Sequence, residues 1–101
     1  MMINNFRLDE LAVMAAKNVG FDGEISAEFR HFETAKALYE KHHNYLRIEL
    51  SDFLQDAPEG VVLEALSRTI NHSRDRRNGK PSEGYMKWCD ENRHRWEVKK
   101  E

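Results

Sequence analysis

The chain of 101 residues lacks most of the features that would place it in a specialised class of protein. Its single cysteine, Cys89, can form neither an internal disulfide nor a multi-cysteine zinc site, which suits a reducing compartment. No segment approaches the roughly 18 consecutive apolar residues that would span a bilayer, and the N-terminus lacks the layout of a secretion signal. We therefore expect a cytoplasmic protein with no membrane partner.

The chain also lacks the large basic excess that is typical of nucleic-acid-binding domains. Its net charge is −2, but the charge is unevenly distributed. Residues 1–60 carry six Lys and Arg against eleven Asp and Glu, whereas residues 61–101 carry ten against seven. The C-terminal part therefore allows an anionic partner without requiring one.

What the chain does contain is enough apolar material for one domain. Its hydrophobic fraction is 40%, and a chain of this length supports a single core. We expect one α+β domain over residues 1–96, followed by a charged tail at 97–101. Charged residues make up 34% of the chain, which leaves little room for a deep, enclosed active site.

Two periodicities predict the N-terminal elements. Apolar residues recur at three- and four-residue steps before Gly20, which predicts a helix over Phe6–Val19 with a glycine cap. The alternation of apolar and polar residues over Ile25–Phe32 then predicts a half-buried strand.

The next segment, residues 34–45, is open to two interpretations. It contains good helix formers, but the alternation that follows it favours a hairpin of Lys36–Lys41 with Tyr45–Leu50. We predict the hairpin, because it completes a three-stranded, mainly antiparallel sheet, whereas a helix would leave only two strands.

Proline residues mark the starts of two C-terminal helices. Pro58, in the first turn after Asp56, predicts a helix over about Pro58–His72 with an apolar stripe. Pro81 opens a final helix that carries several aromatic residues. The predicted fold is an N-terminal helix, a three-stranded sheet and two C-terminal helices packed on one face of that sheet.

The entrance to the central helix resembles that of a known enzyme family. Between a strand and a helix the chain reads Ser-Asp-Phe-Leu-Gln-Asp-Ala-Pro-Glu, over residues 51–59. This phrase and the order of the elements over residues 25–96 resemble SprT-like zinc peptidases and related predicted metal-dependent hydrolases. The resemblance implies that the family's His-Glu-x-x-His motif would fall on residues 68–72.

Only one residue of that motif is present. Arg68 and Thr69 stand where the first histidine and the glutamate belong, and His72 alone matches. Zinc hydrolysis needs two imidazoles one helical turn apart and a carboxylate that takes a proton from the bound water. We therefore predict a non-catalytic relative without a cofactor, with His72 as a candidate metal ligand. A metal-dependent hydrolase with an atypical site is an alternative.

A basic cluster after the central helix offers a second alternative, a small nucleic-acid-associated module. Basic side chains there either offset the partial negative charge of the helix terminus or contact phosphates. The cluster consists of Arg74, Arg76, Arg77 and Lys80.

Two tryptophans on the last helix are candidates for a partner surface. Trp88 and Trp96 share its aromatic face with Tyr85, and such residues either fill the core or anchor a protein partner. The resemblance at the entrance to the central helix, taken with the missing motif, predicts a binding or assembly module whose partner is unknown, with protein favoured over nucleic acid.

Overall fold

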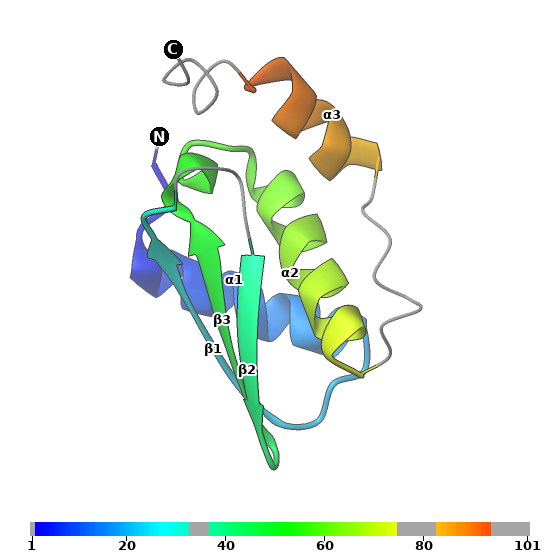
Figure 1. Cartoon of the computed structure of the whole chain (residues 1–101). Helices are drawn as coiled ribbons and strands as arrows, with labels where there is room; N and C mark the ends of the chain where they lie inside the picture. Colours follow the sequence, from blue (N-terminus) through cyan, green and yellow to red (C-terminus); the bar gives the residue numbers. More distant parts are fainter. Residues whose placement is uncertain (1, 33–36, 75–82, 94–101) are drawn as a thin grey trace.

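A computed structural model describes residues 2–32, 37–74 and 83–93 of the chain (Figure 1). The predicted fold class, α+β with one N-terminal helix, three strands and two C-terminal helices, is confirmed. Among the described residues, no helix combines the length and apolar composition that a membrane crossing requires. The elements in chain order are α1 (Asn5–Asn18), β1 (Glu24–Arg30), β2 (Ala37–His42), β3 (Tyr45–Ser51), the short 3-10 helix η1 (Asp52–Leu54), α2 (Glu59–Arg74) and α3 (Glu83–Glu91).

The sheet has the strand order β1-β3-β2. β2 and β3 form the predicted hairpin, which turns at His43, where φ is 50°. β1 lies on the other side of β3 and runs parallel to it, from Glu24 beside Tyr45 to Arg30 beside Ser51. The sheet is therefore mixed, with one parallel and one antiparallel pair. Alternation in the sequence identifies the side chains that face the core, but it carries no information about strand order.

One face of the sheet forms the core. Leu46, Ile48 and Leu50 of β3 are fully buried on that face, beneath α1 and α2 (Figure 1). Burying each of these side chains contributes roughly 2 kcal/mol. The other face is polar and is crossed by ion pairs, such as Arg30 to Glu49 at 2.9 Å. Such exposed pairs stabilise the fold little.

Two polar contacts orient the helices. The side chain of Asn4 accepts a hydrogen bond from the Arg7 N–H at 2.8 Å and caps the start of α1. Arg7 also donates to both carboxylate oxygens of Glu59, from Nε at 2.7 Å and from Nη2 at 2.8 Å, which joins the first turns of α1 and α2. The start predicted at Pro58 is correct to within one residue, since its carbonyl accepts from the Val62 N–H at 3.2 Å.

The third helix packs on the second. α3 lies against α2 (Figure 1). Its Tyr85 is buried, with a relative exposure of 7%. Burial raises the pKa of Tyr85 to about 12 and also raises the pKa of the neighbouring Cys89. Both groups are therefore neutral at physiological pH and serve packing.

Candidate functional site

Two of the positions that would carry the zinc motif, Arg68 and Thr69, have side chains that pack within the fold. The hydroxyl of Thr69 is buried and donates to the Ala65 carbonyl at 2.8 Å. The Arg68 guanidinium lies over the ring of Tyr85, 5.9 Å from its centroid. Thr69 is buried and bonded within its own helix, and Arg68 is a cation stacked on an aromatic ring. Neither side chain fits a zinc ion.

His72 packs against an aromatic ring. It is half-buried and packs edge-on against Tyr39 of β2, with ring centroids 6.0 Å apart. Within residues 2–32, 37–74 and 83–93, no group of three His, Cys, Asp or Glu side chains could hold a metal ion. His72 therefore belongs to no such group in the part of the chain that the structure describes.

Of the four basic candidates, only Arg74 is among the described residues. Its guanidinium donates to the Val19 carbonyl at 2.9 Å, the Gly20 carbonyl at 3.4 Å and Asn71 Oδ1 at 2.6 Å. These contacts place Arg74 at the C-terminus of α1, where a cation offsets the helix dipole. The prediction of a phosphate-contacting cluster now depends on three residues outside the described ranges: Arg76, Arg77 and Lys80.

Of the two tryptophans, only Trp88 is among the described residues. Trp88 is half-buried and packs at the border of the core, so it helps to fix α3. Trp96 and the tail at 97–101 lie outside the described residues. A partner surface made by both tryptophans stays a prediction.

The outer side of α1 is a surface that the sequence analysis missed. Three large apolar side chains point away from the core there: Phe6 is 76% exposed, Val13 is 44% exposed and Met14 is 43% exposed. The helical periodicity used to predict α1 registers only the buried stripe. The available signal was that positions 6, 13 and 14 fall on the opposite, solvent side of the same helical wheel.

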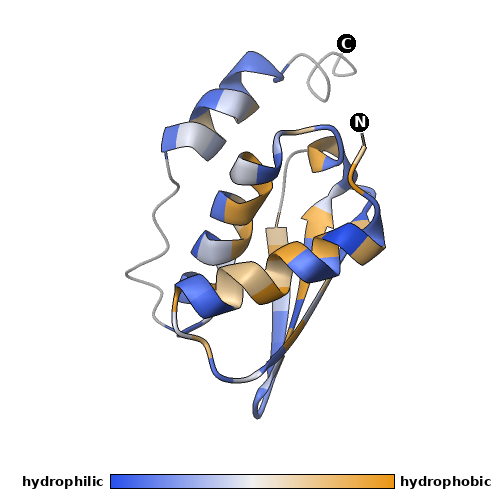
Figure 2. Cartoon of the chain, turned by 180° about the vertical axis from the view of Figure 1, so that it is seen from behind, coloured by the Kyte–Doolittle hydropathy of each residue, from blue (hydrophilic) through white to orange (hydrophobic). Residues whose placement is uncertain are grey.

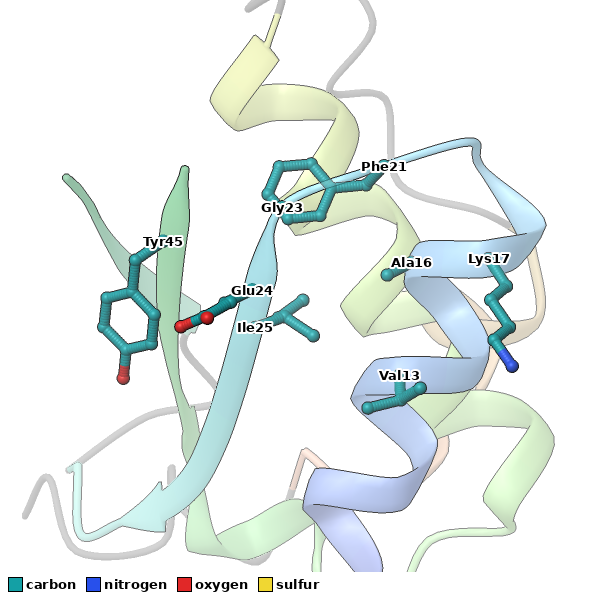
Figure 3. A pocket seen from close by; sticks show the side chains of 8 residues that line it. All are labelled: Val13, Ala16, Lys17, Phe21, Gly23, Glu24, Ile25 and Tyr45. Carbon is teal, nitrogen blue, oxygen red and sulfur yellow. The ribbon is translucent and has the colours of Figure 1, made fainter. Parts of the chain in front are cut away.

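A groove of about 460 Å³ adjoins this surface, between the C-terminal half of α1 and the beginning of β1 (Figure 3). Ile25 points from β1 toward Val13, and the Phe21 ring lies near them. Lys17 lies on the helix side of the groove, and Glu24 lies on the strand side. The complete lining is Val13, Ala16, Lys17, Phe21, Gly23, Glu24, Ile25 and Tyr45.

The helix cap and a glycine shape the groove. Gly20, with φ of 72°, ends α1 in a Schellman motif: its N–H donates to Lys17, and the Phe21 N–H donates to Ala16 at 2.8 Å. This reversal brings Phe21 back over Ala16. Gly23 then lies so close to the turn between β2 and β3 that a Cβ on Gly23 would be 2.1 Å from the backbone oxygen of Asn44. The close approach admits only glycine there.

Side chains of α1 cap the free edge of β1. The Glu24 N–H donates toward β3, to the Asn44 carbonyl at 2.7 Å, so alternate residues of β1 direct their N–H groups the other way. Asp9 Oδ1 accepts from the Ala27 N–H at 2.8 Å, and Asn5 Oδ1 accepts from Phe29 at 2.8 Å. These bonds block pairing of the edge with another strand.

The series of caps is interrupted at the groove. Four helix residues rise about 6 Å, close to the length of two strand residues, so helix positions 5, 9 and 13 match strand positions 29, 27 and 25. Position 13 is valine, which has no acceptor, and no side chain among the described residues accepts from the Ile25 N–H. The groove thus combines apolar walls with one backbone donor that lacks a side-chain acceptor.

We compared the chain with protein-family models, curated proteins and solved structures, and found no match in any of the three.

Proposed function

We propose that this chain is a non-catalytic protein-binding module, a relative of SprT-like zinc peptidases that has kept their scaffold without their metal centre. Its binding site is the α1 surface, which we define as Phe6, Val13 and Met14 together with the groove beside them. The observation that carries this proposal is the exposure of the three apolar side chains on the solvent side of a packed helix.

The exposed side chains favour a protein partner on energetic grounds. Burying a phenylalanine, valine or methionine side chain contributes roughly 1.5–3 kcal/mol each, so covering this surface would drive association. Soluble monomers seldom leave large apolar patches uncovered, and phenylalanine and methionine are enriched in protein interfaces. By comparison, the outer face of the sheet carries cross-strand ion pairs such as Arg30 to Glu49, which are typical of a solvated surface.

The groove adds the means of recognition. Its apolar walls at Val13 and Ile25 suit an aliphatic or aromatic side chain of the partner. The Ile25 N–H suits a backbone or side-chain carbonyl, and Lys17 and Glu24 present opposite charges at the two sides. A protein segment supplies all of these groups at once.

Two residues support the non-catalytic part of the proposal. Thr69 uses its hydroxyl within α2, and Arg68 packs under α3, so neither side chain can act on a substrate without disturbing the packing of a helix. Elemental analysis of the purified chain tests this part. One tightly bound zinc per chain, or hydrolysis that a chelator abolishes, would contradict it.

The binding part is tested by crosslinking with a matched pair of variants. Phe6→Ser removes the most exposed residue of the α1 surface, and Leu38→Ser removes a large apolar residue, 41% exposed, from β2. We expect the wild-type chain and Leu38→Ser to crosslink to the same protein partner in an extract of the source cells, and Phe6→Ser to lose it. Equal crosslinking by all three chains would overturn the proposed site.

A further inference from the structure

We propose that the partner of the α1 surface is a second copy of this chain, packed against the first with the two α1 helices antiparallel. This inference rests on the proposed function, because it assigns an occupant to the same surface. It is argued from the arrangement of charge and apolar residues along α1.

One line of side chains runs along the solvent side of α1. Phe6, Glu10, Val13 and Lys17 follow one another at steps of four, three and four residues, which places them on a single face of the helix. Met14 lies next to Val13 on this face. The line therefore has an acidic residue one turn before its apolar centre and a basic residue one turn after it.

This order of charges is complementary to itself only in the antiparallel arrangement. When a two-fold axis passes beside Val13 and Met14, Glu10 of each copy lies opposite Lys17 of the other, and Val13 lies opposite Met14. A parallel pair would instead place Glu10 opposite Glu10 and Lys17 opposite Lys17. The two ion pairs thus select the orientation as well as the register.

The same register directs each Phe6 to the groove of the other copy. From the axis to Phe6 the helix rises about 11 Å, which in the second copy reaches past Asn18 to the turn that ends α1, beside the groove-lining residues Lys17 and Phe21. Phe6 therefore lies at the end of α1 of the second copy, where the chain turns back toward Phe21 and the groove. Each groove accepts one aromatic side chain, so both Phe6 side chains, the most exposed large apolar side chains among the described residues, become buried together.

The residues that make these contacts are available. In Figure 2, α1 crosses in front of the other elements, and no other described helix or strand covers its outer side. Lys17 forms no ion pair among the described residues. Glu10 contacts only Arg7 of its own helix in the described part of the chain, at 3.3 Å, and an exposed pair of this kind is readily shared.

Charge reversal gives the sharpest test, measured by sedimentation velocity over a concentration series of the full chain. Wild type should pass from monomer to dimer as concentration rises. Glu10→Lys and Lys17→Glu should each raise the dimer dissociation constant on the order of tenfold, because each turns two attractive pairs into repulsive ones. An equimolar mixture of the two variants should dimerise as wild type does, since both ion pairs then reform between unlike chains.

Phe6→Ser tests the apolar contact, with Leu38→Ser as its control. We expect Phe6→Ser to weaken dimerisation by tenfold or more and Leu38→Ser to leave it unchanged. Thermal unfolding of each variant verifies that it is folded. Phe6 is 76% exposed, so its removal should leave the fold of the monomer intact.

Two results would overturn this inference. One is a chain that stays monomeric up to millimolar concentration, and the other is a mixture of the charge variants that associates no better than either alone. If the chain is monomeric but Phe6→Ser still loses a different crosslinked protein, the second-copy inference fails while the proposed binding function stands. If Phe6→Ser affects neither measurement, both fail.

Discussion

The two long helices, α1 and α2, lie on the same face of the sheet but differ in whether another element covers their outer sides. α2 is covered by α3, whose Tyr85 lies over Arg68. α1 is covered by no other described element (Figure 2). The covered side of α2 presents charged residues such as Glu64 and Arg68, whereas the open side of α1 presents Phe6 and Val13.

This difference shows that the composition of an outer helix face does not by itself decide whether the chain covers it. α3 packs on a partly charged face because the methylene groups and the cation of Arg68 suit an aromatic ring. The outer side of α1, which exposes Phe6 and Val13, lacks such a cover within the described chain. Its cover, in our proposal, comes from another molecule.

The largest effect on stability is expected from a substitution that detaches α3 from α2. Tyr85→Ala removes the buried anchor of α3 and should lower the free energy of unfolding by about 4 kcal/mol, because a large buried aromatic side chain is lost. Urea denaturation followed by tryptophan fluorescence measures the change. Met86→Ala, at an exposed position of the same helix, is the control and should cost little. Equal effects of the two variants would contradict the view that Tyr85 holds α3 on α2.

A pair of glycine substitutions compares the groove with the α2–α3 contact. Gly23→Ala should cost about 3 kcal/mol, because its Cβ would lie 2.1 Å from a backbone oxygen that cannot move freely. Gly84→Ala would place a Cβ 2.5 Å from the Glu64 carboxylate, the flexible end of a side chain, and should cost much less. Thermal unfolding of both variants measures the two losses in stability. A larger loss for Gly84→Ala than for Gly23→Ala would contradict this prediction.

A stabilising substitution is expected where the caps on β1 are interrupted. Val13→Asn would supply an acceptor for the Ile25 N–H, as Asp9 does for Ala27, and should raise the free energy of unfolding by about 1 kcal/mol. Valine and asparagine have similar helix propensities, so the gain reports the new bond. Unfolding is measured at low protein concentration, where self-association does not contribute. Met14→Asn is the control, and an equal gain there would refute the explanation.

The smallest effect concerns the link between the two helices. The Arg7 guanidinium lowers the pKa of Glu59 below its ordinary value of 4.5. A carboxyl with a lowered pKa in the folded state adds stability above its ordinary pKa, and this contribution disappears as the pH falls through the lower, folded value. Wild type should therefore exceed Glu59→Gln slightly in stability above about pH 4.5 and lose that advantage in more acidic solution. In an Arg7→Gln background the difference should be absent at every pH.

Much of the fold could be predicted because its signals are local. Alternation over Tyr45–Leu50 correctly favoured the hairpin over the helix propensity of the preceding segment. Gly20 and Pro58 marked real helix ends, since left-handed backbone and a missing N–H act within one turn. The parallel pairing of β1 with β3 could not be predicted, because it depends on which strand of the hairpin β1 joins.

Most of the candidate site could not be predicted from the sequence. Arg74 was expected among anion contacts, but the end of α1 lies beside it and offers the Val19 carbonyl. Phe6 was assigned to a helix but not to a surface, because the apolar stripe of Leu8 and Leu11 predicts which side of α1 faces outward but not whether another element covers that side.

The sequence by itself determined the elements, their inward faces and the absence of a complete zinc motif at residues 68–72, because these properties depend on residue identity and near neighbours. Only the tertiary structure decided which outer faces are covered. It matched Asp9 to Ala27 and left Ile25 opposite Val13, residues that are distant in the chain and adjacent only once β1 lies along α1. The α1 surface exists for that reason: a residue's exposure is set by what packs on it, and packing joins segments that local patterns cannot relate.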